Sequence, residues 1–428
     1  MINVLILLGT WISIEALSFV AMRMFLESSG QVANQRRAAL SEDRSNPELK
    51  FNAPAIIHPY IGTVMSPQVD GGGASIDGKY DAKYAVTEYG FVDTGPPIHQ
   101  RSTTRVIVGI LGGAVAQQFG QNATDALAEE LSQIPAFAGR EFQFVRLANG
   151  DYKQPQQLMT VNYLLTLGAE FDILINLDGV NEAALPGIDN VPVGVFSAYP
   201  RDWGKMVATT ASPDFVRMAG YLAYLRKQER DDALWFGSTP WKYSPTALLV
   251  WEIRKQRLDH SIGLQLQVIN RYTKKEMTFC GSGPPEHFES QQAMYEHCTE
   301  LWWRSSLLLH RLCAARGIRY FHFLQPNQYV VGSKPIGQDE AAAAIQEGSP
   351  ICVAIRACFP LMQAQAPRLA KAGVDITDLT GVFADHAEPI YNDTYCRMGL
   401  PGDLIMAKAI AARIRHSLSK PMQSNTPQ

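Results

Sequence analysis

The sequence has few cysteines, almost no net charge, no internal repeat and no long low-complexity tract. Its 38 lysine and arginine residues nearly balance its 41 aspartate and glutamate residues, which gives a formal net charge of -3. This balance gives no electrostatic reason to expect a nucleic-acid partner. The six cysteines form no Cys-x-x-Cys motif and no cluster with histidine, so the sequence predicts no zinc site, no other metal and no cofactor.

An apolar stretch near the N-terminus predicts attachment to a membrane. Residues Val4 to Met22 are apolar except for Glu15 and a few small polar residues. At a rise of about 1.5 Å per residue, a helix of this length would cross most of a hydrocarbon core about 30 Å thick. We therefore expect a membrane anchor with a single transmembrane pass within residues 1–26. One alternative is a cleaved signal peptide, but no clear small-x-small cleavage site follows. The other is a buried soluble helix, because Glu15 and Arg23 weaken the apolar character.

Two features disagree about which side of the membrane holds the rest of the chain. Arg23, Arg36 and Arg37 follow the apolar stretch, and the positive-inside rule read alone places the body in the cytoplasm. The cysteines are even in number, and two of their spacings would permit disulfides in an oxidising compartment, although buried free thiols explain them equally well. They are Cys280, Cys298, Cys313, Cys352, Cys358 and Cys396. Asn122 begins an Asn-Ala-Thr glycosylation sequon.

Charge and helix-breaking residues divide the chain into segments. The stretch over residues 27–50 is polar and charge-rich, as is typical of a linker. Residues 51–104 contain several prolines and a triple glycine, which predict an irregular segment. An organised domain follows over residues 105–420, and a polar tail occupies residues 421–428.

Within residues 105–420, strand-like apolar runs alternate with helical patterns. The runs are Arg105 to Leu111, Phe142 to Leu147, Phe171 to Leu177 and Arg319 to Leu324. Such alternation is the signature of a doubly wound parallel sheet with helices on both faces. Between about residues 191 and 316 long amphipathic stretches replace it, which predicts a helical insertion. The predicted fold class is therefore α/β: a three-layer, doubly wound, flavodoxin-like parallel sheet with a helical insertion and an N-terminal transmembrane helix.

Glycine and asparagine follow the ends of three of these runs. The first run ends on Gly112-Gly113-Ala114, a strand-to-helix turn that displays an alanine where α/β enzymes expose reactive groups. Gly150 follows the second run, where a glycine lets the backbone approach a substrate oxygen; a simple turn glycine is the alternative. Asn181 follows the third run, between Asp178 and Glu182. These two carboxylates are interpreted as turn formers rather than metal ligands.

Together with a C-terminal segment around Asp393, these features resemble the SGNH (GDSL-type) hydrolase family over about residues 105–417. Members of that family display a nucleophilic serine after the first strand, a glycine after the second and an asparagine after the third. An Asp-x-x-His segment precedes their last helix. The resemblance implies that the backbone N–H groups at Ala114 and Gly150 and the side-chain amide of Asn181 are oxyanion donors.

The reactive residues of the family are missing from this chain. Ala114 occupies the serine position. Counting forward from Asp393 places the histidine position at Cys396, and counting back from Gly402 places it at Arg397. Alanine cannot form an acyl-enzyme, and an arginine that stays protonated cannot act as the base. A neighbouring arginine would lower the pKa of the Cys396 thiol, but a buried thiol or a disulfide is the simpler interpretation.

The resemblance therefore implies a membrane-anchored, catalytically inactive SGNH-hydrolase-like protein. Its expected role is that of a scaffold or assembly subunit of a membrane complex, or of a binder of glycans or acyl groups. The alternative is an active esterase or acylhydrolase that acts on an extracytoplasmic polysaccharide or a small ester. Such an enzyme would need a serine and a histidine from elsewhere in the chain, for which Ser75 and His386 are nominal candidates. Because family members usually expose this domain outside the cytoplasm, we favour a periplasmic body.

Overall fold

The computed structural model describes residues 2–26, 55–67, 85–207, 213–272 and 279–419. The chain divides into two compact units that alternate along the sequence. The α/β unit comprises Phe51–Met206 and Ser282–Gln428, and the helical unit comprises Met1–Lys50 and Val207–Gly281. The linker and the polar tail predicted at residues 27–50 and 421–428 lie outside the described residues.

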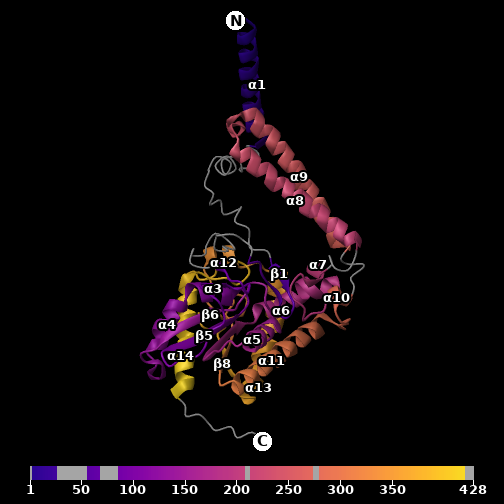
Figure 1. Cartoon of the computed structure of the whole chain (residues 1–428). Helices are drawn as coiled ribbons and strands as arrows, with labels where there is room; N and C mark the ends of the chain where they lie inside the picture. The colour runs from indigo at the N-terminus through magenta and orange to yellow at the C-terminus, as the bar shows by residue number, and fades with distance from the viewer. Residues whose placement is uncertain (1, 27–54, 68–84, 208–212, 273–278, 420–428) are drawn as a thin grey trace. The chain divides into compact units, whose positions relative to one another are not determined.

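A five-stranded parallel sheet forms the centre of the α/β unit (Figure 1). In spatial order its strands are β6 (Glu141–Arg146), β5 (Arg105–Gly112), β7 (Ile173–Asp178), β8 (Arg319–Leu324) and β9 (Asp375–Asp378). Four of them lie where the sequence predicts strands, so the predicted α/β class with a parallel sheet is confirmed. The sequence does not predict the edge strand β9, because Asp-Ile-Thr-Asp is short, has three polar residues out of four and is only partly buried.

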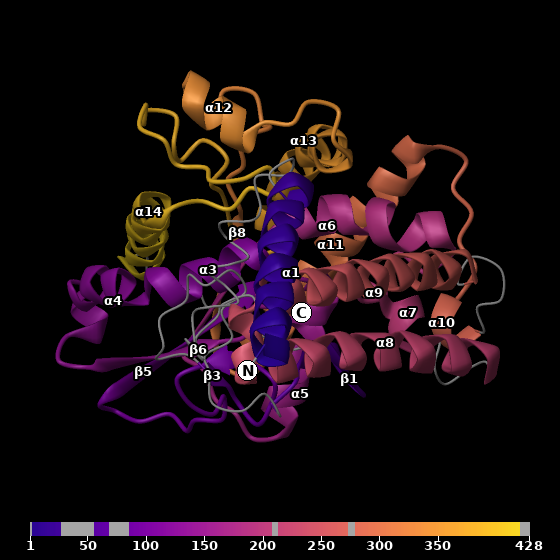
Figure 2. The same cartoon turned by 90° about the horizontal axis from the view of Figure 1, so that it is seen from above.

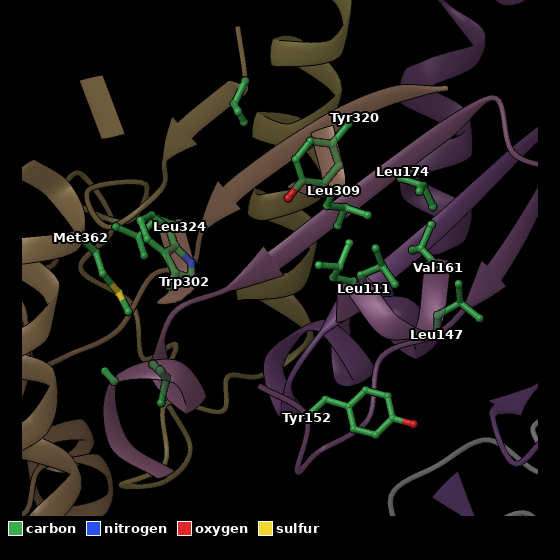
Figure 3. Close-up of a cluster of buried hydrophobic side chains, with 14 of the residues drawn as sticks. Leu111, Leu147, Tyr152, Val161, Leu174, Trp302, Leu309, Tyr320, Leu324 and Met362 are labelled. Carbon is green, nitrogen blue, oxygen red and sulfur yellow. The ribbon is translucent and has the colours of Figure 1, made fainter. Parts of the chain in front are cut away.

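Helices cover both faces of this sheet, and the side chains of β7 alternate between them. Ile173, Ile175 and Leu177 join one buried cluster, whereas Leu174 joins the other. This period of two is expected of a strand that is buried on both faces. Figure 3 shows the second cluster, in which Leu174 and Leu324 lie on the same face as Trp302.

The helices divide between the two faces according to the cluster that their buried side chains join. On the first face lie α3 (Ala114–Asn122), α4 (Thr124–Ser132) and α14 (Leu400–Ser419). On the second lie α5 (Gln156–Thr166), α6 (Val180–Leu185), α11 (Gln291–Ala315) and α13 (Pro350–Lys371). The remaining short helices are α7 (Trp203–Val207), α10 (Phe279–Ser282) and α12 (Gln338–Ala344).

The segment over residues 51–104 was expected to be irregular, but its described residues include two small antiparallel sheets. One pairs β1 (Ala55–His58) with β2 (Gly62–Met65), and the other pairs β3 (Ala85–Val86) with β4 (Val92–Asp93). Each strand has four residues or fewer, which is too short for the sequence pattern to indicate a strand.

The helical unit consists of α1 (Ile2–Leu26) and an antiparallel helical hairpin, α8 (Pro213–Ser238) and α9 (Pro245–Tyr272). A short turn, Pro240–Tyr243, joins the two hairpin helices, which lie side by side in Figures 1 and 2. The predicted N-terminal helix is present. Among the described residues, however, no helix has both the length and the apolar character that crossing a membrane requires.

The helical insertion predicted over residues 191–316 contains elements of two kinds. The hairpin of α8 and α9 belongs to the helical unit. The third long helix of this region, α11, instead packs on the sheet through buried residues such as Trp302 and Leu309. An amphipathic pattern alone could not distinguish the two, because both kinds of helix bury one side.

Candidate functional site

The carboxyl ends of β5 and β7 meet where the chain leaves the sheet toward opposite faces, a position at which α/β sheets commonly bind ligands. Gly112 ends β5 with a φ of +138°, a conformation that L side chains rarely adopt. A Cβ atom at this position would lie 2.0 Å from the carbonyl oxygen of Leu177 on β7. The turn therefore requires glycine, and it begins α3 at Ala114.

The structure brings the three predicted oxyanion positions to this edge of the sheet. Asn181 lies in the first turn of α6, and its side-chain Nδ2 donates hydrogen bonds to the carbonyl oxygens of Gly150 (2.9 Å) and Tyr152 (2.7 Å). A Cβ atom at Gly113, directly before Ala114, would lie 2.4 Å from the same Nδ2 atom. The side-chain amide of Asn181 thus donates to the protein's own backbone, and its two hydrogens are already used.

The C-terminal segment that resembles Asp-x-x-His packs near the first helix of the site. Gln118, one helical turn after Ala114, donates a hydrogen bond from Nε2 to the carbonyl oxygen of Met398. Asp393 accepts hydrogen bonds from the backbone N–H groups of Tyr395 (2.8 Å) and Arg397 (3.1 Å). The same carboxylate forms an ion pair with the Arg397 guanidinium. At one of the two positions where the resemblance places a catalytic histidine, the chain thus has an arginine that is paired with Asp393.

The cysteines are all free, and five of the six are buried. The disulfides that two of the spacings would permit are therefore not formed. Cys396 is fully buried and has a φ of +65°. Burial, aided by the negative charge of Asp393, raises the pKa of the Cys396 thiol well above its usual value. The thiol form is favoured, which disagrees with the possibility that Arg397 activates it as a nucleophile.

Of the two nominal replacements for the missing reactive residues, only His386 can be placed, and its hydrogen-bond partner is Glu388 rather than a residue of this site. Ser75 lies outside the described residues. The His386 ring has its Nδ1 2.8 Å from Oε1 of Glu388, which is exposed.

A buried polar network lies beneath the site, and the sequence interpretation missed it. Asp178, the last residue of β7, is fully buried, although it was interpreted as a turn former. Its carboxylate accepts hydrogen bonds from Trp302 Nε1 (2.7 Å), Asn176 Nδ2 (2.7 Å) and Gln154 Nε2 (3.2 Å), and lies 2.8 Å from His322 Nε2. Burial alone would raise the pKa of Asp178, but His322 and the hydrogen-bond donors hold it below its usual value. The network therefore stabilises a carboxylate inside the protein.

Ser306 of α11 extends this network into an arrangement with the composition of a hydrolase triad. Its Oγ lies 2.7 Å from His322 Nδ1, and His322 Nε2 lies 2.8 Å from Asp178. In a serine hydrolase the serine contacts Nε2 and the carboxylate contacts Nδ1. Here the two ring nitrogens have exchanged partners, and Ser306, His322 and Asp178 have no exposed surface. The arrangement therefore has no access for a substrate.

Two further ionisable residues, Glu182 and Lys153, are buried at the same end of the sheet. Glu182 accepts hydrogen bonds from the backbone N–H groups of Gln154 (3.0 Å) and Gly179 (2.8 Å). Burial and the nearby carboxylate of Asp178 raise the pKa of Glu182 to about 8. Burial lowers the pKa of Lys153 to about 8, and its Nζ donates to the carbonyl oxygen of Ser197 at 2.6 Å. Within the described part of the chain, no three histidine, cysteine, aspartate or glutamate side chains could hold a metal ion together.

Asp403, near the start of α14, is a second buried carboxylate next to α3. Its Oδ2 accepts hydrogen bonds from the side chains of Asn122 (2.8 Å) and Gln118 (3.1 Å). Its Oδ1 is buried without a hydrogen-bond partner among the described residues. Burial raises the pKa of Asp403 to about 7, against these two hydrogen bonds. Folding thus favours the protonated form, whose contribution to stability is complete below pH 3.8 and is lost as the pH rises through 7.

The variant Asp403→Asn should remove this pH dependence. The asparagine oxygen can still accept from Gln118 and Asn122, and its amide takes the place of the unpaired Oδ1. Near pH 4 the variant should match the wild type, and above pH 7 it should be about 2–4 kcal/mol more stable. Denaturant unfolding at both pH values measures the difference, with Asp385→Asn at an exposed site as the control. Parallel pH profiles for wild type and Asp403→Asn would contradict the expectation.

Comparisons of this chain with protein-family models and with curated proteins find no match. The resemblance to SGNH hydrolases thus depends on the residues at the strand ends, and their geometry is the basis for a functional proposal.

Proposed function

We propose that this chain is a catalytically inactive SGNH-hydrolase-like protein that acts as an assembly subunit of a membrane complex. In this proposal the α/β unit is a three-layer, doubly wound domain of the flavodoxin-like kind. The chain is attached to the membrane through its N-terminal helix α1, and the α/β unit lies in the periplasm.

One observation carries the proposal: the polar side chains at the positions of the family's functional residues form hydrogen bonds and ion pairs within the protein itself. Asn181 donates to the backbone of Gly150 and Tyr152, and Arg397 is paired with Asp393. Ala114 offers no nucleophile. A ligand would have to replace these internal hydrogen bonds, which favours a scaffold role over the binding of a glycan or an acyl group.

Activity toward a generic aryl ester tests the loss of catalysis. The wild-type chain should give no turnover above background. The variant Ala114→Ser/Arg397→His should give turnover at least about tenfold above it, because it restores a nucleophile and a base that Asp393 can orient. Ala114→Ser alone is the matched control and should stay near background, since Arg397 cannot accept a proton. Wild-type turnover that a serine-directed phosphonate abolishes would contradict the proposal.

Extraction in mild detergent separates the two inactive roles. A scaffold should migrate with a complex much larger than the chain's own 47.3 kDa. A binder should migrate alone, and its melting temperature should rise when an oligosaccharide is added. The second result would replace the scaffold role with glycan binding.

An active esterase is the second candidate, and the arrangement of Ser306, His322 and Asp178 is the observation that favours it. An active enzyme of this kind would need Ser306 to become accessible, because all three side chains are buried, and it would have to use His322 Nδ1 rather than Nε2 as the base. If wild-type turnover is found, Ser306→Ala should abolish it under this second candidate. Retained turnover in Ser306→Ala would exclude the arrangement as a catalytic triad.

A further inference from the structure

The turn of the α8–α9 hairpin exposes many large apolar side chains. We define the hairpin tip as residues 233–251. Within it the exposed fractions are 59% for Leu234, 62% for Trp235, 57% for Trp241, 71% for Tyr243 and 62% for Val250. Apolar surface concentrated in this way on a soluble protein usually marks an interaction site.

Charge is arranged in layers along the hairpin. Within the tip the only charged side chain is Lys242, which is buried, and its Nζ donates a hydrogen bond to the carbonyl oxygen of Gly237 at 3.0 Å. Directly beyond the tip, both helices carry many charges of both signs. They are Arg226, Lys227, Glu229, Arg230, Asp231 and Asp232 on α8, and Glu252, Arg254, Lys255 and Arg257 on α9. An apolar, aromatic tip followed by a charged collar is typical of an element that enters a lipid interface.

The tip also holds the one carboxylate of the apolar helix α1. Glu15 accepts hydrogen bonds from the Ser244 hydroxyl (2.6 Å) and from the backbone N–H of Thr246 (3.1 Å). One turn further on, Ser18 lies 3.0 Å from the Thr246 hydroxyl. The tip therefore provides partners for polar groups of α1 that are costly to expose to lipid.

These contacts place the tip at a definite level along α1. Glu15 precedes Met22, the end of the apolar stretch, by seven residues, or about 10 Å of helix. Figure 1 shows α1 continuing beyond the tip toward its N-terminus. On that part and beside the tip, α1 exposes further apolar side chains: Trp11, Ile12, Ile14, Leu17 and Val20. Apolar side chains are thus exposed on α1 both beside the tip and beyond it.

We propose that the hairpin tip inserts into the phospholipid bilayer beside α1, to a depth of about 10 Å. Trp241 and Tyr243, in the turn next to Ser244, then lie among the acyl chains. Trp235 lies closer to the interfacial layer that aromatic residues prefer, and the charged collar lies toward the headgroups. This inference rests on the proposed attachment of the chain through α1. A bilayer fits better than a protein partner because the apolar, aromatic tip is followed by a charged collar on both helices, and because α1 exposes apolar side chains beside the tip and beyond it.

Site-specific fluorescence in vesicles tests the insertion on the full chain. The background variant is Cys280→Ser, which removes the exposed native thiol, because the other five cysteines are buried. Single cysteines at Trp241→Cys or, as a second tip site, Trp235→Cys receive an NBD label. Leu264→Cys is the matched control, since this position is also exposed (49%) and lies about 30 Å along α9 from Ser244. Ile12→Cys reports on α1.

In vesicles of phosphatidylcholine and phosphatidylglycerol, the tip label should become at least about threefold brighter and should be quenched by brominated acyl chains. The label at position 264 should do neither. An aqueous tip label together with a lipid-quenched label at position 12 would overturn the insertion while leaving the attachment intact. If the protein does not float with vesicles at all, the proposed attachment itself fails. A bright tip label that lipids do not quench would indicate a protein contact and would also overturn the insertion.

Discussion

Gly112→Ala is expected to prevent the parallel sheet from assembling. The new Cβ would lie 2.0 Å from the Leu177 carbonyl oxygen and 2.6 Å from the Ala116 side chain. The first of these is backbone of the neighbouring strand, so relief requires β5 and β7 to separate. The φ of +138° adds strain that no L side chain avoids. We expect a loss of more than about 4 kcal/mol in the free energy of unfolding, measured as lost soluble yield and lost amide protection in β5 and β7.

The matched control for this substitution is Gly139→Ala. Gly139 also has a positive φ, +73°, but a Cβ atom there would meet nothing within 4 Å. Only the backbone conformation is affected, so this variant should lose about 1–2 kcal/mol and stay folded. Equal effects of the two substitutions would mean that the contact with β7 is not what requires glycine at position 112.

Asp178→Ala is expected to have the second largest effect, a loss of about 3–5 kcal/mol. The substitution leaves the Trp302, Asn176 and Gln154 donors without their acceptor in the interior, and each unsatisfied group costs free energy. His322 loses its partner as well. Denaturant unfolding at neutral pH measures the loss, and hydrogen exchange of the β7 and β8 amides in a separate experiment locates it.

A carboxylate at the surface provides the comparison for Asp178. Glu347 is paired with Arg356 at 2.6 Å, yet both side chains are largely exposed. Glu347→Ala should therefore leave stability almost unchanged, because water replaces the lost partner. If Asp178→Ala lowered the free energy of unfolding as little as Glu347→Ala, the unsatisfied donors of the network would have to be hydrogen-bonded to water that enters the interior.

The sequence was sufficient to predict the parallel sheet and the glycine turn at its edge. The apolar runs at β5, β6, β7 and β8 are long enough to stand out, and Gly112 marks the turn between β5 and α3. The edge strand β9 has no such pattern, since a strand with one free side tolerates polar residues. Its position depends on pairing with β8, which is not evident in its own residues.

The buried network had a signal that the sequence interpretation did not use. In β7, Asn176 and Asp178 are two positions apart and therefore lie on the same face of a strand that is otherwise apolar. Polar side chains in a buried strand need hydrogen-bond partners. Identifying the partners required the register, which pairs Asn176 with His322. The hydrogen bonds from Asn181 to the backbone of Gly150 and Tyr152 depend on the path of a loop, which no pattern of residue types specifies.

The pairing of Glu15 with Ser244 and Thr246 has a consequence for the order of biosynthesis. The α1 carboxylate leaves the ribosome well over 200 residues before its hydrogen-bond donors. At about 5–20 residues per second, this interval lasts roughly 10–50 seconds. The strands β5, β6 and β7 are made during it, whereas β8 and β9 follow the hairpin. Neither unit can be completed before the synthesis of the other has begun. During synthesis the chain therefore holds incomplete parts of both units at the same time.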